Sequence, residues 1–78
     1  METQEIIDRL EKCREQLLTR LVEKYTAQNT EIHAKYKAGK LGYEDKIYSL
    51  KVAYRYFIKE DTAINESINK LLAILESE

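Results

Sequence analysis

The sequence contains no proline and no tryptophan, and its two glycines, Gly39 and Gly42, lie close together. Proline breaks helices and glycine weakens them, so their absence elsewhere is typical of long, uninterrupted helices. A single cysteine, Cys13, excludes an internal disulfide framework and indicates a reducing compartment, for which the cytoplasm is the expected location. We expect Cys13 to be a small buried hydrophobe at the edge of an apolar helix face.

Long apolar runs are also absent. The longest one, residues 71–75, is much shorter than the roughly 20 residues of a membrane-spanning helix. The first five residues are polar and acidic, unlike the basic start of a secretion signal. We therefore expect a protein that has no membrane partner.

Motifs for catalysis, metal binding and nucleotide binding are missing as well. His33 is the only histidine, and a metal site needs several ligands, so we expect His33 to lie at the surface. The sequence thus predicts no enzyme activity, no cofactor and no metal site.

Helix-forming residues dominate the remaining composition. Ala, Glu, Lys, Leu and Arg account for 39 of the 78 residues. With 44% hydrophobic and 35% charged residues, the chain is too apolar to be a typical disordered segment. The composition predicts an all-α protein, and the length allows a single domain, residues 1–78.

The first predicted helix covers about residues 3–38. Its apolar residues fall within roughly half of the helix circumference, and some recur every eleven residues, which keeps one face aligned on a nearly straight helix. Residues 26–30 are poor helix formers, which leaves room for a kink or a short break there. The residues at this spacing are Leu10, Leu21 and Ile32, and Arg14, Tyr25 and Tyr36.

A turn at residues 39–42 separates this helix from a second one at about residues 43–76. Gly39 suits a left-handed C-cap after Lys35 and Lys37. In the second helix, core positions alternate at spacings of four and three, which predicts an unbroken heptad stripe. These positions are Tyr43, Ile47, Leu50, Tyr54, Phe57, Asp61, Ile64, Ile68, Leu71 and Leu75.

A turn of this length makes the two helices antiparallel neighbours, with partner residue numbers that sum to roughly 81. Tyr25 is then expected near Phe57, and Arg20 opposite Asp61. In a hairpin alone, the residues at the edges of the apolar helix faces (the rim residues) stay exposed to solvent. We therefore expect dimerisation into a four-helix bundle. The rim residues are Ile7, Leu18, Val22, Ile58 and Leu72.

Charged residues within the apolar stripes have two interpretations. Arg14 on the first helix either keeps its head group in water or forms a buried polar pair that fixes register or oligomeric state. Arg20 and Asp61 are candidates for a pair that fixes register or oligomeric state.

Charge and tyrosine are both concentrated around the turn. Residues 33–59 carry a net charge of +5, residues 1–32 carry −2 and residues 60–78 carry −4. All six tyrosines fall between residues 25 and 56, and those at 25, 36, 43 and 54 are explained by the core stripes. The candidate partner-binding site consists of an aromatic ribbon and a neighbouring basic ribbon: Tyr48, Val52 and Tyr56, and Lys51, Arg55 and Lys59.

Three roles fit this candidate site. The first is a second packing stripe inside an oligomer, the second is a surface for a protein partner, and the third is a surface for nucleic acid. Aromatic and basic side chains are found in all three kinds of interface. Our hypothesis is a non-enzymatic adaptor, assembly factor or inhibitor that binds a protein partner as a homo-oligomer. The alternative is a regulator that binds RNA or DNA through the basic, tyrosine-rich half.

Overall fold

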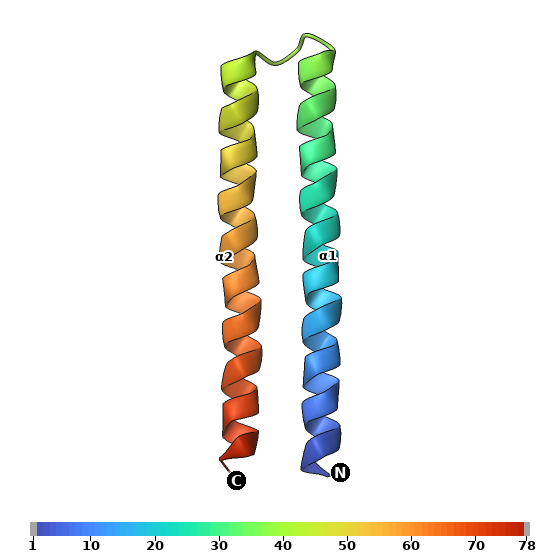
Figure 1. Cartoon of the computed structure of the whole chain (residues 1–78), viewed down its shortest axis with the longest axis vertical. Helices are drawn as coiled ribbons and strands as arrows, with labels where there is room; N and C mark the ends of the chain where they lie inside the picture. The colour runs from blue at the N-terminus through green and yellow to red at the C-terminus, as the bar shows by residue number, and fades with distance from the viewer. Residues whose placement is uncertain (1, 78) are drawn as a thin grey trace.

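Two long helices make up the protein. The structure, a computed structural model, describes residues 2–77. Helix α1 spans Thr3–Lys37 and helix α2 spans Tyr43–Glu76. The helices lie side by side and run antiparallel, with both chain termini at the end opposite the turn (Figure 1). The predicted all-α hairpin is thus confirmed, and within residues 2–77 there is no strand.

The hairpin is a single layer. Its principal-axis extents, measured on the Cα atoms, are 57 × 15 × 8 Å, so the molecule is one helix thick. Neither helix has, in the described part of the chain, a stretch long and apolar enough to cross a membrane.

Both helices are continuous. The sequence left room for a kink or a short break at residues 26–30, and none occurs: α1 is unbroken there, and the Thr30 hydroxyl donates to the Thr26 carbonyl oxygen at 2.9 Å. Threonine makes this bond back to the preceding turn when it does not act as a cap. As expected, α2 also continues through residues 60–62 without a break.

The turn begins with the glycine cap that the sequence predicts. Gly39 has a φ of +74°, in the left-handed region. The Gly39 N–H donates to the Tyr36 carbonyl oxygen at 3.1 Å, and the Lys40 N–H donates to the Lys35 carbonyl oxygen at 2.9 Å. These two bonds form a Schellman motif, which satisfies carbonyl groups at the end of α1. Helix α1 therefore ends at Lys37, one residue before the expected boundary.

The contact seam of α2 differs from the predicted heptad stripe. Three of the expected core residues are exposed: Tyr43 by 63%, Tyr54 by 54% and Leu71 by 47%. Ala53 and Leu72 are buried instead, although we expected Leu72 at the rim. The heptad prediction is therefore wrong at these three positions, and the other seven residues of the predicted stripe are buried or half-buried.

An eleven-residue repeat accounts for this difference. Eleven residues in three turns give 3.67 residues per turn, close to a relaxed α-helix, whereas a heptad stripe requires left-handed supercoiling. Figure 1 shows two nearly straight helices, as the longer repeat requires. Eight of the buried and half-buried positions of α2 follow it: Leu50, Asp61 and Leu72; Ala53, Ile64 and Leu75; Phe57 and Ile68.

One of the predicted cross-helix pairs forms and the other does not. The rings of Tyr25 and Phe57 lie 4.9 Å apart between their centroids, as the pairing rule predicts. Within the described residues Arg20 makes no ion pair with Asp61, and the interhelical ion pair joins Lys24 to Glu60 at 3.3 Å. Glu60 and Asp61 lie on opposite flanks of the seam, since successive residues point 100° apart. Arg20, one turn before Lys24, projects on the flank of Glu60.

The single histidine and the single cysteine of the chain both lie at the surface. His33 is exposed, in agreement with its expected position. Cys13 is also exposed, so the expectation of a buried small hydrophobe is wrong. The reason is again the seam: Leu10, Arg14 and Leu17 face α2 along one side, and Cys13 lies on the flank beside them.

Candidate functional site

The aromatic ribbon of α2 forms one wall of a groove between the helices. Tyr48 is 68% exposed, Tyr56 is 63% exposed and Val52 between them is half-buried. The opposite wall comes from the tip half of α1. We call this feature the tyrosine groove, and its lining residues are Gln28, Glu31, Ile32 and Lys35 of α1 with Tyr48, Ser49, Val52, Ala53 and Tyr56 of α2.

A small residue makes the groove possible. Ala53 is only 8% exposed and lies where a larger side chain would fill the space between the two walls. On the α1 wall, the Lys35 ammonium pairs with the Glu31 carboxylate at 3.3 Å. The groove therefore combines an apolar floor, two exposed phenol rings and one compensated charge pair.

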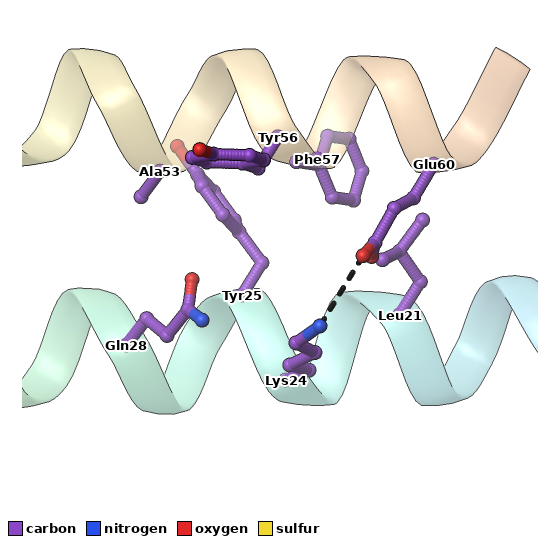
Figure 2. A pocket seen from close by; sticks show the side chains of 8 residues that line it. All are labelled: Leu21, Lys24, Tyr25, Gln28, Ala53, Tyr56, Phe57 and Glu60. Atoms are coloured by element: carbon purple, nitrogen blue, oxygen red, sulfur yellow. Dashed lines mark hydrogen bonds and ion pairs between the residues drawn. The ribbon is translucent and has the colours of Figure 1, made fainter.

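A second hollow continues the groove toward the middle of the hairpin. Figure 2 shows Tyr25 reaching from α1 toward Tyr56 of α2, and Leu21 lying beside Glu60. The ion pair between Lys24 and Glu60 bridges the helices at one end of this hollow.

The position of Tyr48, Val52 and Tyr56 outside the predicted heptad stripe suggests a ribbon remote from the hairpin seam, but the structure places this ribbon at the border of the seam. Tyr56 borders both hollows, because the seam is centred on Ala53 and its flank includes the ribbon. The sequence pattern of α2 gave no sign of the four α1 residues in the groove, since their positions depend on the pairing of the two helices. The register of about 81 would have located them.

The basic ribbon separates from the aromatic one. Lys51 and Arg55 border a different hollow, together with Ile47, Leu50 and Tyr54. Lys51, Arg55 and Lys59 are exposed, and among residues 2–77 none of them forms an ion pair. The structure thus keeps three of the six predicted site residues together and places Lys51 and Arg55 beside another surface.

That surface is the flank opposite the groove. Residues two positions apart on a helix point about 200° apart. We call the side of the hairpin that carries the tyrosine groove the groove flank. One hollow on this flank is lined by Lys24, Tyr56 and Glu60. The residues two positions before each of these three therefore project on the opposite flank. These residues are Val22, Tyr54 and Ile58, with exposures of 49%, 54% and 41%.

Leu18 shares a shallow hollow with Val22, so it belongs to the same flank of α1. We call the surface formed by Leu18, Val22, Tyr54 and Ile58 the outer face.

Polar contacts near the open end of the hairpin involve Arg14. Its Nη2 donates to the Asn69 side-chain oxygen at 2.6 Å and lies 3.6 Å from a Glu11 carboxylate oxygen. The side chain is 23% exposed, and its Nε is buried without a hydrogen-bond partner. Arg14 therefore makes a cross-helix contact, and the sequence did not predict Asn69 as its acceptor.

Aromatic contacts close the tip of the hairpin. The rings of Tyr36 and Tyr43 lie 6.3 Å apart in an edge-to-face arrangement. The Lys46 ammonium lies 4.4 Å from the Tyr36 ring centroid, a distance typical of a cation–π interaction. One of the basic residues near the turn is therefore held against an aromatic ring rather than projecting freely.

Comparisons with known proteins yield no relative from which a function could be transferred. No protein-family model matches the chain. Neither a curated protein nor a solved structure matches it. In the described part of the chain, no group of three or more His, Cys, Asp and Glu side chains is arranged to hold a metal ion.

Proposed function

We propose that this protein is a non-enzymatic interaction module that associates with itself and binds a protein partner in the tyrosine groove. Such a module acts as an adaptor, an assembly factor or an inhibitor through its helix faces.

One observation carries the proposal: the hairpin buries four hydrophobic residues and leaves nine large ones exposed. Its buried core consists of Leu21, Ala53, Ile68 and Leu72. Exposed apolar patches of large extent mark interaction surfaces in soluble proteins. Nine large hydrophobic residues are at least 37% exposed: Val22, Tyr36, Tyr43, Tyr48, Tyr54, Tyr56, Ile58, Leu71 and Ile74.

The tyrosine groove has the character of a partner site. Exposed tyrosines supply large contact areas at low conformational cost, and they are enriched among residues that dominate binding energy. Tyr48 and Tyr56 lie two turns apart on α2 with Val52 between them, so a partner helix or extended segment would contact both rings at once.

The double substitution Tyr48→Ser and Tyr56→Ser tests this site. Helix content should stay unchanged, because both rings are more than 60% exposed. Loss of two aromatic anchors should weaken partner binding by roughly 2–4 kcal/mol. The measurement is quantitative capture from extracts of the native host with tagged wild-type and variant proteins, followed by titration calorimetry with the purified partner.

The matched control is Tyr43→Ser. Tyr43 is 63% exposed, as Tyr56 is, but it contacts Tyr36 at the tip and does not line the groove. Equal capture by the double variant and the control would contradict the groove assignment.

Nucleic-acid binding is the second candidate, favoured by the net charge of +5 over residues 33–59. Backbone phosphates bind clustered lysine and arginine residues with a strong dependence on salt. Nuclease treatment before capture distinguishes the two candidates. Loss of the captured material after treatment, with an affinity that falls steeply between 50 and 200 mM salt, as roughly expected for several phosphate contacts, would favour this alternative.

A further inference from the structure

We infer that the outer face, formed by Leu18, Val22, Tyr54 and Ile58, is covered by a second copy of this chain whose turn points in the opposite direction. This inference rests on the self-association in the proposed function and adds the face, the orientation and one ion pair across the interface. The groove flank stays open for the partner.

The amount of exposed surface matches what a dimer would bury. The chain exposes 6184 Å² at a mass of 9.2 kDa. A compact monomer of this mass exposes about 4,900 Å². The excess of about 1,300 Å² exceeds the roughly 800 Å² that each partner buries in a standard interface. The single layer, 8 Å thick at its Cα atoms, leaves its outer face open to a second layer.

The outer face fits a copy of itself better than the groove flank does. It presents large hydrophobic side chains from both helices, whereas the groove flank carries the bridging pair of Lys24 and Glu60 and the pair of Glu31 and Lys35. Leu18 and Val22 lie on either side of residue 20, the midpoint of α1. In an antiparallel pair related by a two-fold axis at this level, Leu18 packs against Val22 of the partner subunit.

Charge selects the antiparallel orientation. Arg55 and Glu66 are eleven residues apart, so they project from the same side of α2, and they lie on either side of the α2 midpoint. Reversal of the second copy brings Arg55 level with Glu66 of the partner subunit to within a residue or two. In a parallel pair, Arg55 would lie beside Thr26 of the partner subunit, which carries no charge.

Sedimentation equilibrium on the full chain tests the face. Ile58→Glu places a carboxylate in the apolar interface, so it should weaken the dimer at least about 100-fold and yield monomer at micromolar concentration. Tyr56→Glu, two residues away on the groove flank, is the matched control and should remain dimeric. A dimer that survives Ile58→Glu, or one that is lost in Tyr56→Glu, would overturn the assignment. Circular dichroism confirms that both variants remain helical.

A charge swap tests the orientation. Arg55→Glu and Glu66→Arg should each weaken the dimer several-fold, up to about tenfold at low salt, and the double swap should restore it. Failure of the double swap to restore the dimer would contradict the antiparallel orientation.

The two proposals fail in different ways. A chain that dimerises through the outer face yet captures no protein retains this inference and loses the partner function. A monomeric chain that captures a protein through the tyrosine groove loses this inference and retains the groove.

Discussion

Single residues with special backbone or size requirements control the ends and the floor of the hairpin. Gly39 is predictable from the sequence, because a glycine after two lysines is typical of a helix C-cap. Ala53 is not predictable in this way. A small apolar residue adds little to a hydrophobic pattern, and its neighbour Tyr54 fits the predicted heptad stripe. Burial of Ala53 becomes evident only when both helices are present.

The two glycines of the turn allow a test of the cap. Gly39→Ala should lower the free energy of unfolding by about 1–2 kcal/mol, because an L-residue is strained at a φ of +74°. Gly42→Ala should have almost no effect, since Gly42 has a φ of −72° and a new Cβ would meet only Asp45 Oδ2 at 3.9 Å. The measurement is urea unfolding at fixed protein concentration. Equal destabilisation by both substitutions would show that strain at Gly39 is not the cause.

The polar contact of Arg14 with Asn69 illustrates a limit at this scale. The sequence shows that Arg14 lies on an apolar stripe, but it does not identify the hydrogen-bond acceptor of Arg14. Its acceptor is 55 positions away in the chain, and it depends on a helix register that is known only to within a few residues before the structure.

At the scale of helices, the sequence predicts the number, the type and nearly all of the boundaries of the elements. It misplaces the contact seam of α2, because spacings of four and three satisfy both a heptad and an eleven-residue repeat over short distances. The two repeats diverge by about one residue toward the ends of a long helix. Adjacent apolar residues at those ends, such as Leu71 and Leu72, fit either repeat, so only packing against α1 separates them.

This pair of leucines gives a test of the seam. Leu72 is 8% exposed and Leu71 is 47% exposed. Leu72→Ala should therefore cost about 2–4 kcal/mol of unfolding free energy, and Leu71→Ala under about 1 kcal/mol. Both changes remove the same atoms from neighbouring positions, so helix propensity cancels. A larger cost at Leu71 in chemical denaturation would restore the heptad interpretation.

At the scale of the whole molecule, the two flanks of the hairpin are different surfaces. One flank holds the tyrosine groove and its ion pairs, and the other presents Val22, Tyr54 and Ile58 with the basic residues Lys51 and Arg55 beside them. The sequence predicts that apolar surface remains exposed, since rim residues such as Val22 and Ile58 fall outside a two-helix seam. The sequence does not predict that the aromatic and basic ribbons lie on different flanks. The two ribbons run side by side along α2, and only the position of α1 shows which flank each of them belongs to.

This division has a direct consequence for binding. If self-association and partner binding use opposite flanks, one substitution can remove one without the other. A protein with a single shared surface would lose both together.

The central claim is that the isolated hairpin is incomplete and that a second copy covers its outer face. Sedimentation equilibrium of the wild-type chain between about 1 µM and 1 mM tests it most directly. In a dimerising protein the average mass rises with protein concentration, from that of the monomer to that of the dimer. The account predicts a mass of twice 9.2 kDa over most of this range. A constant mass of 9.2 kDa at every concentration would contradict it.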